Sequence, residues 1–321
     1  MIIAETILGE KMHIGELPTP FEQSLICPCC KEPVAIKRGK IRQAHFAHYP
    51  NSHCDSFSEG ETQEHLLSKE FLQKWSRTGV LEAYLPDLQQ RPDLLIDFLA
   101  VEVQCSTLTL ERMEERTLNY QRHRYFPWWI VGDHLVPKNR WSQLQKAFTY
   151  YDQGKGIHLW HIHNHQEIWL MYAIRQHYQL GVIFHVKKWR STKDSLTNLL
   201  GFQMEEKPLF AWEWEAYRFS IRKKFFRKES KILLIQEHLY PMGGNIQSLP
   251  SWCYQASEFY FYFGDWLLFL RFAVLKTDSF KEWLQYLKQG AFVWSYPLVS
   301  QKNILLAVYQ EAVELKNKQN L

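Results

Sequence analysis

The stretch that decides the fold runs from Arg91-Pro92-Asp93 to Glu102-Val103-Gln104, and Cys105-Ser106 follow it. Pro92 favours extended backbone, and residues 93–97 and 101–105 are strand-like segments separated by a tight turn. We therefore expect an antiparallel hairpin that brings Asp93 and Glu102 to the same side of a sheet edge. Because side chains alternate along a strand, Gln104 should share the face of Glu102, while Val103 points into the core.

The flanking segments predict how this hairpin is packed. Thr62 is a suitable N-cap for a helix over 63–76, and Gly79 is its expected stop. Further segments follow in the order strand, hairpin, helix and strand, over residues 80–85, 93–105, 108–124 and 127–132. This α, β, β, β, α, β order predicts a mixed sheet flanked by helices.

The carboxylates suggest phosphodiester chemistry, which requires a divalent ion to activate water. Mg²⁺ prefers oxygen ligands such as Asp93 and Glu102. Glu64 supplies a third carboxylate from the preceding helix, and Lys69 on that helix could contact a phosphate or the attacking water. Each of these residues, taken alone, is better explained as an ordinary turn, strand or solvated helix residue. Their order along the chain, taken together, favours a catalytic site.

A cluster of cysteines and histidines precedes this region. Cys27 and Cys30 have the Cys-x2-Cys spacing of zinc ligands, and we expect His48 and Cys54 to complete a tetrahedral site, with His45 as the substitute for His48. Sulfur and imidazole donors favour Zn²⁺ over Mg²⁺. Four protein ligands leave no open position, so the ion should be structural, and Cys29 should be a non-ligand. The alternative is a set of buried cysteines with incidental histidines.

The bulk properties predict a soluble, cytoplasmic protein of two or three domains. The chain has 321 residues, 46% of them hydrophobic and 15% aromatic, with a formal charge of +4. That charge permits a nucleic acid partner without arguing for one. Glu5 and Glu10 interrupt the N-terminus too early for a signal peptide, and Asp265 and Arg271 make a buried helix the better prediction for the apolar residues 259–275.

Three further groups of residues are candidates for metal or DNA binding. His161 and His163 lie two apart in an expected hairpin over 156–173 and could bind a metal, but a surface or partly buried strand is the favoured interpretation. Arg116 and Tyr120 share a helix face and could touch DNA phosphate or pack against the sheet. A basic run interleaved with phenylalanines could follow a single DNA strand, although a solvated helix face is an equally good interpretation; its candidate DNA-binding residues are Arg222, Lys223, Lys224, Arg227 and Lys228.

Several motifs in order give the chain a specific resemblance. It resembles the competence protein CoiA family over about residues 25–135, whereas the C-terminal part matches only in length and in its aromatic, helical character. The residues that carry the resemblance are Cys27-x2-Cys30, His45-Phe46-Ala47-His48, Cys54, Glu64-His65-x3-Lys69, Arg91-Pro92-Asp93, Glu102-Val103-Gln104-Cys105-Ser106, Glu115-Arg116-Thr117-x2-Tyr120 and Trp129-Ile130-Val131-Gly132.

The resemblance implies an α/β restriction-endonuclease-like (PD-(D/E)xK) core with a small N-terminal zinc module and a mostly helical, aromatic-rich C-terminal region. The expected domains are residues 1–58, 59–150 and 151–321. Asp93 and Glu102 would bind Mg²⁺ or Mn²⁺, Glu64 would support the site, and Lys69 or Gln104 would be the polar helper. Gln104 stands where the wider nuclease pattern has lysine; it is neutral and cannot act as a general base.

Three functions follow as hypotheses. The first is a metal-dependent deoxyribonuclease that hydrolyses phosphodiester bonds of incoming or recombining DNA during natural transformation. The second is a non-catalytic DNA-binding accessory protein with a degenerate nuclease fold, which presents DNA to recombination proteins. The third is a protein-interaction adaptor that uses the aromatic C-terminal helices. No glycine-rich phosphate loop is present, so the sequence does not support an ATP-driven motor.

Overall fold

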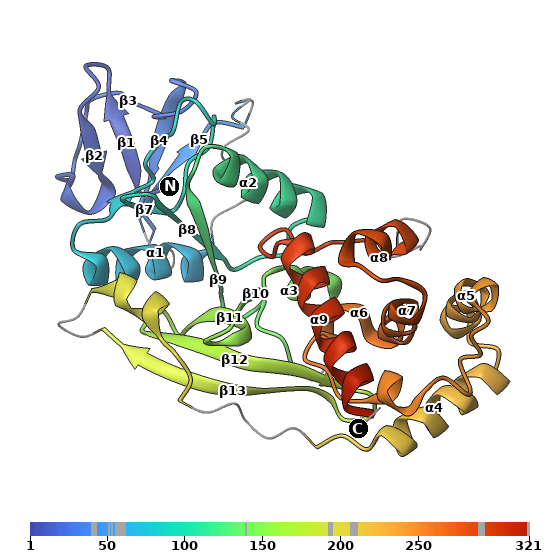
Figure 1. The fold of residues 1–321 in the computed structure, drawn as a ribbon. Helices are drawn as coiled ribbons and strands as arrows, with labels where there is room; N and C mark the ends of the chain where they lie inside the picture. Colours follow the sequence, from blue (N-terminus) through green and yellow to red (C-terminus); the bar gives the residue numbers. More distant parts are fainter. Residues whose placement is uncertain are drawn as a thin grey trace. The chain divides into compact units, whose positions relative to one another are not determined.

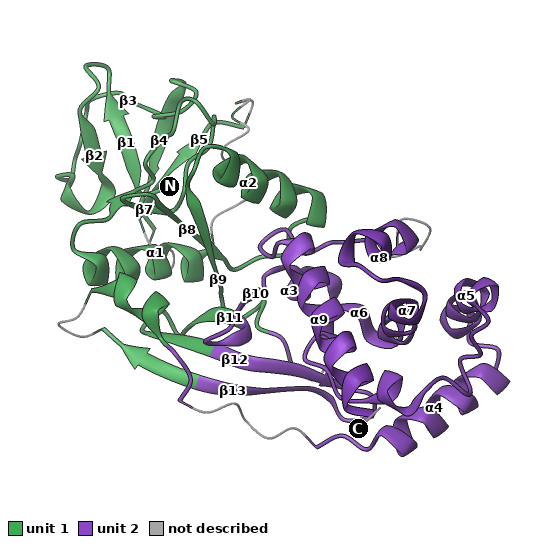
Figure 2. Ribbon diagram, viewed as in Figure 1, with its two compact units in different colours: residues 1–136, 159–170, 187–202 green, residues 137–158, 171–186, 203–321 purple. Residues whose placement is uncertain are grey.

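The computed structural model describes residues 1–39, 44–50, 52, 54, 62–138, 140–191, 195–205, 211–287 and 293–319. The chain divides into two compact units (Figure 2), of which unit 1 holds residues 1–136, 159–170 and 187–202, and unit 2 holds the remainder. The sequence-based boundary between residues 58 and 59 lies outside the described residues. The three-domain division therefore stays a prediction.

Unit 1 begins with an antiparallel sheet of five short strands in the order β2-β1-β3-β4-β5, called here the N-terminal sheet (Figure 1). The apolar side chains Ile2, Ala4, Leu25, Val34 and Phe46 are buried. These side chains form the core on which the N-terminal sheet packs. The strands are β1 (Ile3–Thr6), β2 (Lys11–His13), β3 (Leu25–Ile26), β4 (Pro33–Lys37) and β5 (His45–His48), with a 3₁₀ turn at Ile14–Glu16.

Helix α1 (Gln63–Ser76) has the predicted bounds. The hydroxyl of Thr62 accepts the amide of His65 at 3.2 Å, which caps the first turn. The residue that stops the helix is Arg77 and not the predicted Gly79, because Arg77 adopts a positive φ of 61° and donates its amide to the carbonyl of Gln73. Its buried side chains include Leu66, Leu72 and Trp75, and the helix packs against the strands that follow.

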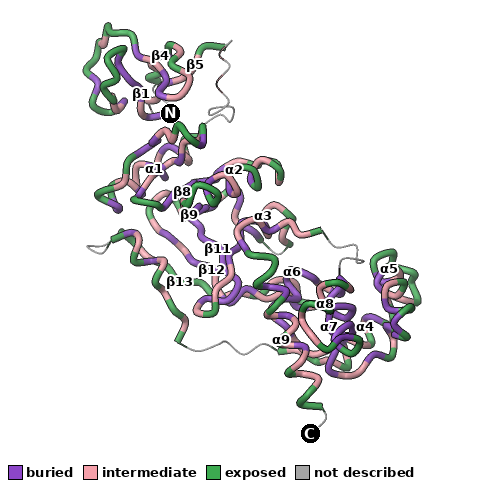
Figure 3. The backbone as a smooth tube through the Cα atoms, turned by 45° about the horizontal axis from the view of Figure 1, so that its top comes forward, coloured by how far each residue is buried: buried purple, intermediate pink, exposed green. Residues whose placement is uncertain are grey.

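Those strands form the main sheet, whose order is β13-β12-β11-β9-β8-β7-β6. β6, β7 and β8 pair antiparallel, whereas β8, β9 and β11 run parallel. The predicted mixed sheet with flanking helices is confirmed, and β8, β9 and β11 are buried along nearly their whole length (Figure 3). The elements are β6 (Val80–Leu81), β7 (Leu94–Ile96), β8 (Leu99–Gln104), α2 (Leu110–Arg122) and β9 (Phe126–Val131).

The strand predicted over residues 80–85 is shorter than expected. Only Val80 and Leu81 pair with β7, because Glu82 adopts a positive φ of 50° and breaks the extended backbone. A single bridge between Leu85 and Gln90 closes the loop that follows.

The expected hairpin is present as β11 (Gly156–His163) and β12 (Glu167–His177), followed by β13 (Gly181–Arg190). Each of these three strands contributes residues to both units. A short strand, β10 (Tyr150–Asp152), pairs with β11, and α3 (Gln143–Ala147) precedes it. The 3₁₀ segment Leu196–Gly201 follows β13.

The rest of unit 2 is helical, as expected. Arg271 is fully buried in α7, and its guanidinium donates to the carbonyls of Cys253, Gln255 and Ala256 and to Glu311. In the part of the chain that the structure describes, no helix is both long and apolar enough to cross a membrane. The helices are α4 (Trp214–Phe226), α5 (Ser230–Leu239), α6 (Tyr260–Phe263), α7 (Leu267–Ala273), α8 (Phe280–Leu287) and α9 (Gln301–Gln319), with 3₁₀ turns at Tyr240–Met242, Ser251–Tyr254, Gly264–Trp266 and Val274–Lys276.

A buried ionic network joins the N-terminal sheet to α1 and the main sheet. The carboxylate of Glu82, 2% exposed, accepts the amides of Ile2 and Ile3 at 3.1–3.2 Å. It also accepts Lys69 Nζ at 2.6 Å and Arg91 Nη1 at 3.2 Å. Because Lys69 is 0% exposed, its charge depends on this carboxylate for compensation.

We expect Lys69→Met to lower the free energy of unfolding by about 3 kcal/mol, because it removes one partner of a buried ion pair while Arg91 still faces Glu82. The control is Lys74→Met, at an exposed position of the same helix, which should cost less than about 0.5 kcal/mol. Urea denaturation of the three proteins measures both values. Equal losses in the two variants would contradict the role of the network.

Candidate functional site

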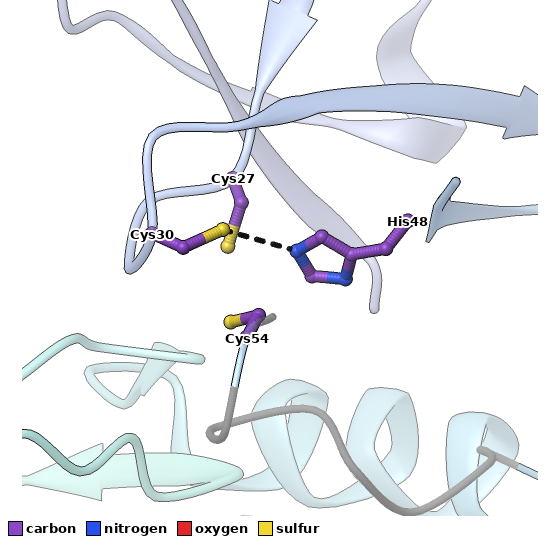
Figure 4. A group of neighbouring side chains, drawn as sticks. All are labelled: Cys27, Cys30, His48 and Cys54. Carbon is purple, nitrogen blue, oxygen red and sulfur yellow. Dashed lines mark hydrogen bonds between the residues drawn. The ribbon is translucent and has the colours of Figure 1, made fainter. Parts of the chain in front are cut away.

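Four potential metal ligands meet beside the N-terminal sheet (Figure 4). Cys27 follows β3 directly, Cys30 lies three residues further in a turn closed by the amide of Lys31 on the carbonyl of Cys27, and His48 is the last residue of β5. With Cys54 they form the cysteine cluster, whose ligand atoms all lie within 4.8 Å of one another. This cluster could hold a zinc ion, as the spacing predicted.

The geometry favours His48 over His45. Cys30 Sγ lies 3.4 Å from His48 Nε2, and the cluster contains His48. His45 is three residues earlier in the same strand, so its side chain points to the opposite face. Cys29 is not part of the cluster, although its backbone amide donates to Cys27 Sγ at 3.3 Å.

Burial and mutual proximity make the thiols poor acids without a cation. Burial raises the pKa of Cys27 to about 11, and it also raises the pKa of Cys54, with the neighbouring cysteines adding to the effect. Burial lowers the pKa of His48, which keeps its imidazole neutral. Neutral imidazole and thiolates are the forms that bind Zn²⁺, and a cation among the sulfurs would favour the thiolates. The residues therefore fit the ion in kind and in number.

Asp93 and Glu102, called here the carboxylate pair, lie at the predicted hairpin. Asp93 precedes β7, and its Oδ2 accepts the amide of Val103 in β8 at 2.8 Å. Glu102 is the neighbour of Val103 in that strand and is 2% exposed. The negative charge of Asp93 contributes to raising the pKa of Glu102, so the two groups interact electrostatically.

Asp93 is held in its charged form. Burial alone would raise its pKa, but His65, Lys69 and the Val103 amide outweigh burial and hold the pKa well below its usual range. His65 Nε2 lies 2.9 Å from Oδ2, and Lys69 Nζ lies 3.7 Å from Oδ1. Lys69 is also bound to Glu82, so the predicted helper residue is part of the buried network described above.

Glu102 has two partners on α2. Arg116 Nη2 and Tyr120 Oη both donate to Glu102 Oε1, each at 2.5 Å. Burial raises the pKa of Glu102 to about 7, although Arg116 and Tyr120 favour its charged form. Of the two interpretations of Arg116 and Tyr120, the structure places both against the sheet, with Tyr120 0% exposed and Arg116 over the ring of Trp129.

Gln104 and Glu64, the other two predicted site residues, make hydrogen bonds to the backbone. Gln104 follows Glu102 on the same face, but its amide donates to the carbonyl of Ser106 at 2.8 Å. Glu64 reaches the end of β9, where its Oε1 accepts the amide of Asp133 at 2.6 Å. A Cβ at Gly132 would collide with Glu64 Oε1, which accounts for glycine at this position.

Three ligand atoms also meet at Asp133, His161 and His163, which we call the histidine cluster. The sequence indicates the two histidines as possible ligands but not Asp133. The two histidines were detectable because they are two residues apart on one strand, β11. Asp133 was not, because it follows a different strand, β9. Neither cluster in the described ranges contains Asp93 or Glu102.

The basic run lies on α4 and just beyond it in unit 2. Arg222, Lys223, Arg227 and Lys228 are exposed, and the rings of Phe219 and Phe226 are 58% and 76% exposed. Lys224 differs from them, because it donates to the buried carboxylate of Asp265 at 2.8 Å.

Two regions of the chain match models of known protein families. A family model described as the N-terminal domain of competence protein CoiA matches residues 16–57, and one described as its nuclease-like domain matches residues 61–204. Competence protein CoiA of Bacillus subtilis (strain 168) is 32% identical over 140 residues, which cover 41% of this chain and 35% of that protein. The match thus spans about a third of the relative's length. No solved structure matches the chain significantly.

The two matched regions contain the candidate metal-binding and catalytic residues, whereas the basic run on α4 lies outside both. The first contains Cys27, Cys30, His48 and Cys54, and the second contains the carboxylate pair and the histidine cluster. The resemblance inferred from the motifs is therefore confirmed, and the chain belongs to the competence protein CoiA family.

Proposed function

We propose that the chain is a metal-dependent deoxyribonuclease with a PD-(D/E)xK core, which hydrolyses phosphodiester bonds of incoming or recombining DNA during natural transformation. The observation that carries the proposal is the carboxylate pair: the partly buried Asp93 just before β7 and the buried Glu102 on β8, the neighbouring strand of a mixed sheet, interact electrostatically. The match of this region to a nuclease-like family model supports it.

The residues suit Mg²⁺ or Mn²⁺ in kind, because Asp93 and Glu102 offer hard oxygen donors. These two residues would hold the ion, which would activate water and offset charge on the scissile phosphate. His65 and Lys69 keep Asp93 ionised, and Arg116 and Tyr120 orient the carboxylate of Glu102. Glu64 supports the adjoining strand end through the amide of Asp133.

A specific observation favours a second candidate, a non-catalytic DNA-binding protein. Arg116 already neutralises Glu102, and Gln104 turns its amide to Ser106, so the usual lysine function has no evident substitute in that strand. A protein of this kind would bind DNA and present it to recombination proteins without cutting it.

For both candidate functions, we propose that DNA contacts the exposed basic side chains on and just beyond α4. Arg222, Lys223, Arg227 and Lys228 can meet phosphates, while Phe219 and Phe226 offer rings for base stacking. Lys224 is a weaker candidate, because its charge is already compensated by Asp265.

The cysteine cluster is proposed as a structural zinc site. Four protein ligands leave no open position for a substrate, and the strands that carry them are short. The ion would join the turn after β3 to the end of β5.

We expect Asp93→Asn and Glu102→Gln each to reduce Mg²⁺- or Mn²⁺-dependent DNA cleavage to background, because each replaces a charged ligand by a neutral side chain of the same shape. Cleavage of labelled single- and double-stranded DNA by the purified full chain provides the measurement. Glu115→Gln is the matched control, since Glu115 is exposed on α2 and pairs only with Arg112 among the described residues.

The outcomes separate the two candidates. Cleavage that survives in both variants would place the active site elsewhere. DNA binding by the wild-type chain with no cleavage under either ion would favour the non-catalytic protein.

A second prediction concerns DNA affinity. Replacing Lys223, Arg227 and Lys228 together by alanine should weaken binding to single-stranded DNA of any sequence and reduce the slope of log K against log salt by about 2, at about 0.7 per phosphate contact. Fluorescence anisotropy at several salt concentrations measures the slope. The control is the triple alanine variant at the exposed residues Lys281, Lys302 and Lys318, and equal slopes in the two variants would remove α4 from the interface.

For the zinc site, we expect Cys27→Ser to contain about one equivalent of zinc less than the wild-type chain and to unfold at a lower temperature. Cys29→Ser should retain the metal, because Cys29 is adjacent in sequence but outside the cluster. Metal analysis by mass spectrometry and thermal unfolding provide the readouts. Since the pKa of the Cys27 thiol is raised, protons should displace the ion as the pH falls. A wild-type chain without zinc, or equal zinc in both variants, contradicts the assignment.

A further inference from the structure

The histidine cluster lies at the ends of two parallel strands in unit 1. β9 and β11 are paired, with His161 opposite Val131. Asp133 lies two residues beyond Val131, and His163 two residues beyond His161, so all three side chains come to the carboxyl edge of the sheet. Ligand sites in sheets of this kind commonly lie at that edge.

The two imidazole rings both face one oxygen of the Asp133 carboxylate. His161 Nε2 lies 2.8 Å and His163 Nδ1 lies 2.9 Å from the same oxygen, Asp133 Oδ1. Ligands bonded to an ion at about 2.0–2.1 Å are separated by about 2.9 Å at a right angle and about 3.4 Å at a tetrahedral angle. The two N···O distances are hydrogen-bond lengths that also match the separation of ligands around one small ion, and all three ligand atoms lie within 4.8 Å of each other.

The surroundings hold these side chains in place. Trp169 packs against His163 with ring centroids 4.1 Å apart and against His161 at 5.4 Å. The second carboxylate oxygen, Asp133 Oδ2, accepts the backbone amide of Asn164 at 2.9 Å. Metal ligands are typically oriented by such outer contacts.

Two polar atoms beside the cluster are buried without a hydrogen bond. Within the described residues, neither His161 Nδ1 nor Glu64 Oε2 has a hydrogen-bond partner. Glu64 is fastened next to the cluster, because its other oxygen accepts the amide of Asp133. A buried carboxylate oxygen is costly unless something compensates it; His134 Nε2 lies 3.6 Å from Glu64 Oε2, and a cation at the cluster would compensate this charge further.

We propose that Asp133, His161 and His163 bind a divalent transition-metal ion, at a site separate from the cysteine cluster and from the carboxylate pair. Two imidazoles and one carboxylate suit ions of the zinc, iron, cobalt or nickel class better than Mg²⁺, which prefers an all-oxygen shell. Three protein ligands leave coordination positions for water, unlike the four ligands of the cysteine cluster.

Binding requires each ring nitrogen that faces Asp133 to give up its proton. His161 would then carry its proton on Nδ1 and His163 on Nε2, so that both rings stay neutral. Asn164 already lies 3.0 Å from His163 Nε2 and could accept that proton through its amide oxygen after a flip of the amide.

The test uses the full chain carrying Cys27→Ser, stripped with a chelator and titrated with Co²⁺, because this background disables the cysteine cluster. We expect this chain to bind Co²⁺ with ligand-field absorption but no thiolate charge-transfer band, and to lose that absorption when the histidine cluster is disrupted. Adding His163→Ala, a half-exposed position, should weaken Co²⁺ binding by about 100-fold or more, at least as much as the loss of an outer-shell partner. Asp133→Asn should also weaken Co²⁺ binding.

The matched control adds His185→Ala instead, since His185 is exposed on β13 and lies outside the cluster. This variant should bind Co²⁺ as the Cys27→Ser chain does, and circular dichroism should show that all variants are folded. Equal Co²⁺ affinity in the His163→Ala and His185→Ala chains, or no Co²⁺ binding in the Cys27→Ser background, would overturn the proposal. The readout is metal binding, so it does not depend on whether the chain cleaves DNA.

Discussion

The carboxylate of Glu82 is the interaction on which the arrangement of unit 1 depends. It is buried, so its charge requires several donors at once, and it receives them from the amides of Ile2 and Ile3, from Lys69 on α1 and from Arg91. The N-terminal sheet, the helix and the loop before β7 must therefore meet at one point. A chain that misplaced any of them would leave a buried charge without compensation.

The same network extends to the carboxylate pair. Lys69 lies between Glu82 and Asp93, at 2.6 Å and 3.7 Å from their oxygens. Glu102 is compensated separately, by Arg116 and Tyr120 from α2. The two acids of the proposed site therefore have different sets of donors, which explains why the pKa of Asp93 is held low while burial raises that of Glu102 to about 7.

Local sequence patterns were sufficient to predict several elements of unit 1. The Thr62 cap, the helix over 63–76, the hairpin that carries Asp93 and Glu102, and the Cys27/Cys30 spacing all appear in the structure as predicted. Such signals depend on residues close in sequence, whose spacing follows from helix and strand geometry. The strand over residues 80–85 was overestimated, because the positive φ of Glu82 serves a tertiary contact that propensity does not reveal.

The sequence by itself determined the element order, the parity that places Glu102 and Gln104 on one face, and the family motifs. Only the tertiary structure decided which charges meet. In the fold, Arg116 and Tyr120 donate hydrogen bonds to Glu102, and Glu64 accepts the amide of Asp133. His161 and His163 both contact the carboxylate of Asp133. The physical reason is that these partners come from different strands and helices, so their meeting depends on how the sheet is assembled.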